Sequence, residues 1–163
     1  IFRIGDTVSA GEPFSYAPIP PFQPERFAVL RNTTIEKHKQ FYKGLDQLRE
    51  EGVVQVLFAV DQARREPILA AVGDLQFEVV TSRLETEYGV ETLLERLPHT
   101  EARWLIGEAE DIREMYLPMQ SLRVRDQDQR DAVLFSTAWD LRYGLEKNPN
   151  LKFLTLSELH DLA

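Results

Sequence analysis

The sequence predicts an α+β fold built on a ferredoxin-like split βαβ unit, in which two helices cover one face of a four-stranded antiparallel sheet. Residues 53–60 are almost wholly apolar, as is typical of a central strand. Residues 33–51 and 74–88 carry apolar side chains at helical spacing, and a glycine follows each of them. Short extended segments flank both helices. The order β-α-β-β-α-β therefore fits within residues 25–97.

The first half of this unit has local signals for a strand and a helix. The strand is expected at residues 25–31. The spacing Thr33-Thr34-Ile35-Glu36 predicts a capping box, so the helix should begin at about Thr33. Gly52 is its expected left-handed stop. The predicted buried stripe consists of Phe41, Leu45 and Leu48. Gly44 within this helix indicates close packing against a neighbour, because glycine weakens a helix by ~1 kcal/mol relative to alanine.

The second half repeats the pattern. A polar loop at residues 61–66 leads to a strand at 67–73, and Asp74 is the expected N-cap of the second helix. Gly89 should end that helix, and residues 91–97 should form the fourth strand. The predicted inner face of the helix, packed around Val54, Val56 and Phe58, consists of Phe77, Val80, Leu84 and Tyr88.

The chain divides into three parts. Residues 1–24 form an edge strand (1–8) and a proline-rich linker, and residues 98–163 form a smaller α/β extension. In that extension strands are expected at 102–106, 122–125, 132–135 and 151–156, helices at 108–115 and 136–147, and a charged turn at Asp126–Asp131. The extension is either a second half-sheet or a layer packed on the first unit; it shows no residue-level repeat of that unit.

Composition excludes several classes of function. The 43% apolar content is enough for a sizeable core, and the absence of cysteine excludes disulfides and thiolate metal sites. There is no apolar run near the ~18 residues of a membrane span. A net charge of −8 argues against broad capture of nucleic acid, so any RNA contact should use a local patch. The first residue, Ile1, suggests a piece of a longer protein.

No catalytic constellation is present in the sequence. The phosphate-binding pattern G-x-x-x-x-G-K-[ST] does not occur, so the chain should neither bind nor hydrolyse GTP and should need no cofactor. Its three histidines, His38, His99 and His160, fall in separate elements without metal-ligand spacing, and we expect them on the surface. The carboxylate pairs are expected to be solvated faces in so acidic a chain.

Basic residues are the remaining candidates for function. Lys39 and Lys43 should lie one helical turn apart beside the buried stripe, as a solvated face or as a contact to RNA phosphate or a neighbouring domain. Arg64 and Arg65 should lie at a reachable hairpin tip. We expect Arg123, Arg125 and Arg130 to pair with Asp126, Asp128 and Asp131, and we expect Trp104 and Trp139 in the core.

The chain resembles the third domain of the translocase-type GTPases that act on the ribosome, and most closely the class II peptide chain release factors of bacteria. The run Gly73–Gly89 is shared with several such factors, and Ile1–Val8 resembles the end of the β-barrel that precedes this domain. The strings that separate the release factors are Lys43-Gly44-Leu45, Glu50-Glu51-Gly52-Val53-Val54-Gln55-Val56, Leu75-Gln76-Phe77 and Ala102-Arg103-Trp104. The charged turn at Asp126–Asp131 departs from the family pattern.

This resemblance implies a role in binding and coupling. The parent would be a cytoplasmic GTPase of translation termination, holding GTP and Mg²⁺ in a separate domain and driving class I release factors off the ribosome. This part would be a monomer that faces the small ribosomal subunit and packs against its own GTPase and β-barrel domains. The candidate contacts are Lys39, Lys43, Arg64, Arg65 and Arg83. The alternatives are a small-molecule regulatory domain, the third domain of another translational GTPase, or a standalone enzyme.

Overall fold

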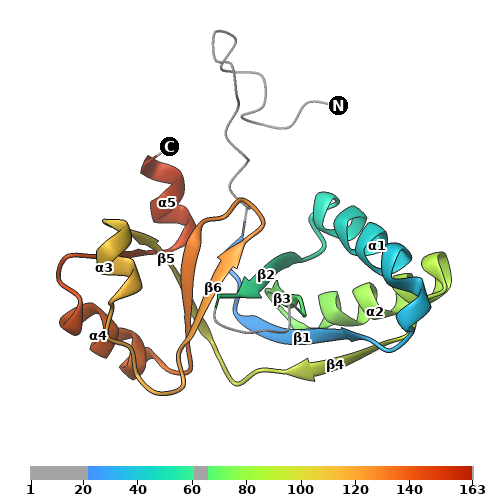
Figure 1. Ribbon diagram of the computed structural model, residues 1–163, viewed down its shortest axis with the longest axis horizontal. Coiled ribbons are helices and arrows are strands. Elements are labelled where there is room, and N and C mark those ends of the chain that lie inside the picture. Colours follow the sequence, from blue (N-terminus) through green and yellow to red (C-terminus); the bar gives the residue numbers. More distant parts are fainter. Residues whose placement is uncertain (1–21, 61–65, 163) are drawn as a thin grey trace, which may run out of the picture.

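The computed structural model describes residues 22–60 and 66–162, which form an α+β fold on one antiparallel sheet (Figure 1). The eight strands lie in the order β4-β1-β3-β2-β6-β7-β5-β8. The predicted edge strand at residues 1–8, most of the proline-rich linker, and Arg64 and Arg65 lie outside the described residues.

The strands are β1 Arg26–Asn32, β2 Gln55–Ala59, β3 Ile68–Ala71, β4 Thr92–Arg96, β5 Glu101–Ile106, β6 Leu122–Asp126, β7 Asp131–Phe135 and β8 Lys152–Leu154. The helices are the 3₁₀ turn η1 Ile35–Lys37, and α1 His38–Glu50, α2 Asp74–Tyr88, α3 Ala109–Arg113, α4 Ala138–Lys147 and α5 Leu156–Leu162.

The first half of the sheet is the split βαβ unit that the sequence predicts. Strand β3 lies between β1 and β2, antiparallel to both, and β4 pairs with the outer edge of β1. Helices α1 and α2 cover one face of these strands (Figure 1). Their shared core contains the predicted side chains of both helices, namely Phe41, Leu45, Leu48, Phe77, Val80 and Leu84, with Tyr88 at its margin.

Gly44 brings the two helices close together, as its position in the helix predicts. A Cβ atom at this position would lie 2.6 Å from Leu84 Cδ2 and 2.8 Å from Tyr88 Cδ2. Such distances are shorter than real carbon contacts, so only a residue without a side chain fits here unless its neighbours move. Gly52 and Gly89 follow α1 and α2 with φ angles of 80° and 66°, in the left-handed region expected for helix stops.

The extension continues the same sheet rather than packing on it as a separate layer. Strand β6 pairs antiparallel with β2, with Phe58 opposite Arg125, and β7, β5 and β8 follow outward. The face of the first half opposite α1 and α2 shares a core with the second half and with α5. Phe27, Leu57 and Trp104 belong to this shared core. Helices α3 and α4 cover the remaining face of the second half (Figure 1).

The N-termini of α1 and α2 differ from the prediction. Helix α1 begins at His38 after a 3₁₀ turn and has no side-chain cap, and the Thr33 hydroxyl donates to the Glu91 carbonyl oxygen at 2.9 Å. Gly73, not Asp74, is the N-cap of α2. Gln76 Oε1 accepts a hydrogen bond from Gly73 N at 3.1 Å, whereas the Asp74 carboxylate pairs with Arg96.

The C-terminal strand is shorter than predicted, and the helix α5 that follows it was missed. Residues 152–154 form β8, and Thr155 and Glu158 then make a reciprocal capping box. Glu158 Oε1 accepts from Thr155 N at 2.9 Å, and Thr155 Oγ1 accepts from Glu158 N at 3.2 Å. The Thr155 backbone N–H, together with the Thr155 hydroxyl, which donates to the same Oε1 at 3.1 Å, lowers the pKa of the Glu158 carboxyl.

The burial of two side chains differs from the prediction. Trp104 is buried as expected, but Trp139 is 71% exposed because α4 turns Gly144, and not its tryptophan, toward the ring of Phe135. His99 is buried rather than on the surface, and its Nε2 lies 2.7 Å from the Gln120 carbonyl oxygen.

Candidate functional site

Lys39 and Lys43 project from the outer face of α1. An α-helix turns by about 100° per residue, so a position two residues from a buried one lies nearly opposite to it. Lys39 and Lys43 each lie two residues from the buried Phe41, and both are exposed. Their predicted place beside the buried stripe is therefore wrong. Both lysines therefore lie on the exposed face of α1, opposite its buried stripe, where a partner can reach them.

Neither lysine is used within the described part of the chain. No ion pair found there involves Lys39 or Lys43. Their neighbour Lys37 differs, because its Nζ donates to the Gly89 carbonyl oxygen at 2.9 Å and thereby satisfies the C-terminal end of α2. Two of the three clustered lysines thus remain available for an external anion.

Arg83, also a predicted contact residue, is engaged inside the domain. Its guanidinium binds both oxygens of Glu51, at 2.6 and 3.1 Å, and its Nε binds Glu87 at 2.8 Å. Arg83, with a smaller contribution from Gln47, lowers the pKa of the Glu51 carboxyl to about 2. The same carboxylates raise the pKa of Arg83. Arg83 therefore ties α2 to the C-terminal end of α1 and is not brought together with Lys39 and Lys43.

The charged turn between β6 and β7 is organised by Asp126. Its Oδ1 accepts from the backbone N–H groups of Asp128 and Arg130, each at 2.9 Å. Its Oδ2 accepts from Trp104 Nε1 and Arg130 Nη1, each at 3.2 Å. The predicted pairing is confirmed for Arg130, and Arg125 pairs with Asp131 at 3.0 Å.

Arg123 differs from the prediction, because its Nη1 donates to the Arg113 carbonyl oxygen at 3.4 Å. The sequence pattern does not predict the hydrogen bond from Trp104 to Asp126. A buried indole N–H needs an acceptor, and that requirement was the available signal.

This turn approaches the outer face of α1. Gln127 Nε2 donates to Asp46 Oδ1 at 3.4 Å, and Asp46 is exposed three residues after Lys43. Residues three apart on a helix share a face. We define the α1 surface as Lys39, Lys43 and Asp46, with Gln127 at its border. The Asp46 carboxylate places a negative charge at the edge of this surface that faces the β6–β7 turn.

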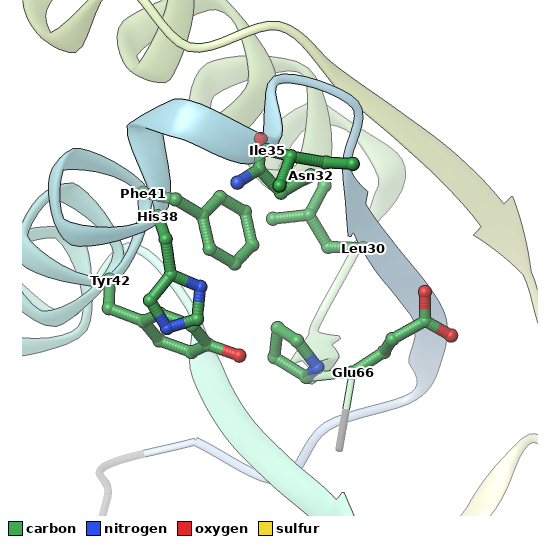
Figure 2. Close-up of a pocket in the computed structure, with 8 residues that line it drawn as sticks. Leu30, Asn32, Ile35, His38, Phe41, Tyr42 and Glu66 are labelled. Carbon is green, nitrogen blue, oxygen red and sulfur yellow. The ribbon is translucent and has the colours of Figure 1, made fainter. Parts of the chain in front are cut away.

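A small pocket lies at the start of α1 (Figure 2). Its volume is about 170 Å³, and it is lined by Leu30, Asn32, Ile35, His38, Phe41, Tyr42, Glu66 and Pro67. Burial, with a smaller contribution from Glu66, raises the pKa of the Tyr42 phenol. Small-molecule sites usually enclose roughly 300–1,000 Å³, so this pocket is too small for a typical regulatory ligand.

A wider hollow lies between α2 and β4 but has the wrong lining for such a ligand. It measures about 680 Å³ and is lined by hydroxyl and carboxylate side chains, namely Thr33, Glu78, Thr81, Ser82, Glu85, Thr86, Glu91 and Thr92. Ligand pockets are predominantly apolar and aromatic. Among residues 22–60 and 66–162, no group of three or more histidine and acidic side chains is placed to hold a metal ion. None of the described helices is long and apolar enough to cross a membrane.

Comparison with known proteins places these features in a family. The family model described as "Class II release factor RF3, C-terminal domain" matches residues 16–144. A protein of Gloeobacter violaceus named peptide chain release factor 3 is 51% identical over 97% of this chain. Proteins of the same name from Trichormus variabilis and Symbiobacterium thermophilum are 46% and 47% identical over 96% and 94% of it. The chain spans 30%, 29% and 29% of these three relatives.

Proposed function

The chain belongs to the family of C-terminal domains of class II release factor RF3, and from this premise we propose that it is the ribosome-contacting and coupling module of a longer termination factor. Its contribution is binding and the transmission of domain movement. GTP and Mg²⁺ would be held in a separate domain of the full-length protein. Hydrolysis there would serve to drive class I release factors off the ribosome in the cytoplasm.

The observation that carries this proposal is the pair of lysines on the α1 surface. Lys39 and Lys43 lie one turn apart, exposed and without an ion pair among the described residues, in a protein of net charge −8. In a chain of net charge −8, two neighbouring lysines that lack an ion pair among the described residues suit a small phosphate contact better than an extended nucleic-acid footprint. We assign this contact to ribosomal RNA on the small-subunit side.

The remaining partners follow from the same proposal. The domain would pack against its own β-barrel and GTPase domains, and it would act as a monomer that meets class I release factors only indirectly. A switch of this kind requires contacts that differ between nucleotide states. Neither of the two hollows described above favours the regulatory-ligand alternative, because one is small and the other is lined by polar groups.

The test is a double substitution, Lys39→Ala with Lys43→Ala, in the full-length factor. Ribosome-stimulated GTP hydrolysis and recycling of class I factors should fall, while the melting temperature of this domain stays nearly constant, because exposed substitutions usually change stability by less than about 0.5 kcal/mol. The charge-matched control is Lys147→Ala with Lys152→Ala, two exposed lysines at the other end of the molecule. Equal activity of both double variants would show that Lys39 and Lys43 are solvent-exposed residues without a role in ribosome binding.

A further inference from the structure

One side chain fastens the segment that leads into β1 to two distant parts of the fold. Gln23 Nε2 donates to the Ala102 carbonyl oxygen on β5 at 2.9 Å. Gln23 Oε1 accepts from the backbone N–H of Leu156, the first residue of α5, at 2.8 Å. Both ends of the amide are thus used, and each holds a different element.

The residues on either side of Gln23 are also fixed. Gln55, buried at the start of β2, donates from Nε2 to the Phe22 carbonyl oxygen at 3.0 Å. Pro24 is buried, and Glu25 N donates to the Ala71 carbonyl oxygen on β3 at 2.9 Å. Four consecutive residues are therefore held against β2, β3, β5 and α5. We call residues 22–25 the strap.

The strap also completes the N-terminus of α5. The first N–H groups of a helix have no partner within it. Here the capping box of Thr155 and Glu158 satisfies part of this need, and Gln23 satisfies Leu156 N. Leu156 and Leu159 place α5 on the core shared by both halves of the sheet. A displacement of the strap would therefore remove a hydrogen bond from α5 and disturb the packing of α5 against that core.

We propose that the strap is an orientation clamp, with Gln23 as its positioning residue, which fixes the point at which the preceding polypeptide enters the fold relative to the sheet and to α5. This inference rests on the proposed function, in which the domain transmits movement to the domains that precede it. A segment held by hydrogen bonds to four elements transmits rotation, whereas a free linker averages it away. Gln55 acts in this clamp through its side chain, whereas Ala102 and Ala71 contribute backbone carbonyl oxygens.

The substitution that tests the clamp is Gln23→Met, which keeps the length of the side chain and removes its donor and its acceptor. Its matched control is Gln40→Met, on the exposed face of α1. In the full-length factor, spin labels would be placed in the domain preceding residue 22 and at Lys152→Cys on β8. The distance distribution measured by double electron–electron resonance should broaden for Gln23→Met and stay as narrow as the parent's for Gln40→Met. Identical distributions for both variants would overturn the proposal.

Hydrogen exchange in the 163-residue chain provides the second readout. Exchange of the Leu156 amide should accelerate by at least about tenfold in Gln23→Met, since local opening loses one of its restraints. Gln23→Glu keeps the acceptor for Leu156 N and replaces the donor to Ala102 by a carboxylate oxygen. This variant should preserve protection at Leu156 and still broaden the distance distribution. If Gln23→Met loses protection at Leu156 but its distance distribution does not broaden, Gln23 only caps α5, which contradicts the clamp.

The distance measurement needs no ribosome, so it separates the clamp from the lysine contact. Broadening in Gln23→Met supports the clamp even if the variant of Lys39 and Lys43 leaves hydrolysis unchanged and the proposed function fails. If the distance distribution broadens but ribosome-stimulated hydrolysis by Gln23→Met equals that of Gln40→Met, the clamp stands and the coupling role in the proposed function is contradicted.

Discussion

Asp126 is a buried acid whose carboxylate serves as the scaffold of the β6–β7 turn. It accepts hydrogen bonds from two backbone N–H groups, from the Trp104 indole and from Arg130. Gln129 can adopt its left-handed φ of 64° there because the turn around it is fixed at both ends. Trp104 and the charged turn between β6 and β7 are thus parts of one hydrogen-bonded unit.

The substitution Asp126→Asn tests this unit. It keeps the shape of the side chain but removes the charge and replaces one acceptor by a donor, which would face Trp104 Nε1–H and Arg130. Because hydrogen bonds to charged groups contribute about 1.5–3 kcal/mol, the free energy of unfolding in urea should fall by about that amount. Asp128→Asn, on the exposed side of the same turn, should cost no more than about 1 kcal/mol. Equal losses for the two variants would show that Asp126 is not the organising residue.

Single residues show where prediction from sequence succeeds and where it stops. Gly44 was predicted correctly because a glycine inside a helix has few explanations other than close packing. Trp139 was not. The apolar residues of α4 alternate along the chain and so are spread around the helix, and their periodicity selects no inner face. The Phe135 ring makes the selection, since it lies 3.0 Å from the position of a Cβ on Gly144.

The elements show the same limit in their capping signals. Thr33–Glu36 and Thr155–Glu158 have identical spacing, but only the second forms a capping box. Thr33 instead donates its hydroxyl proton to Glu91, a residue that the fold brings alongside it. Strands and helices with strong periodicity were found close to their observed bounds. The seven-residue α5 was not predicted, because the strand predicted at residues 151–156 included Thr155, the first residue of its capping box.

The packing of α1 on α2 supports a double-mutant test at the level of elements. Leu84→Ala should lower the free energy of unfolding by about 2–5 kcal/mol, as for other buried leucines. Gly44→Ala should cost about 1–3 kcal/mol, because its methyl group overlaps Leu84 Cδ2 and the Tyr88 ring.

The two changes should interact when combined, because removal of Leu84 Cδ2 makes room for the new methyl group. The double variant should therefore lose less stability than the sum of the single variants, as measured by urea unfolding. Strict additivity would contradict the contact between α1 and α2 described here. A loss below about 1 kcal/mol for Leu84→Ala alone would show that the inner face of α2 is misassigned.

At the scale of the whole molecule, the sheet is one continuous structure that bends around a shared core. Pairing of β2 with β6 joins the two halves, and Trp104 and Leu57 lie in the core between them. The sequence left this arrangement open, because local periodicity identifies strands without specifying which distant strands pair. The split βαβ order within residues 25–97 was predictable, since its helices and strands each carry a local signal.

The chain as a whole should be a folded domain without nucleotide chemistry. It lacks the glycine-rich phosphate loop in its sequence, so titration calorimetry with GTP and Mg²⁺ should give no saturable heat at micromolar concentrations. The same titration of the full-length factor, for which GTP binding in a separate domain is proposed, provides the comparison. Saturable binding by the 163-residue chain would contradict the division of labour proposed for the factor.

The salt dependence of ribosome binding tests the central claim, that Lys39 and Lys43 contact phosphate, most directly. Each phosphate contact adds roughly one unit to the slope of log K against log salt concentration. The full-length factor with Lys39→Ala and Lys43→Ala should therefore bind more weakly than the parent and show a slope smaller by roughly two units. The control with Lys147→Ala and Lys152→Ala should keep the parent slope. If the variant with Lys39→Ala and Lys43→Ala keeps the salt slope of the parent, the claim is contradicted.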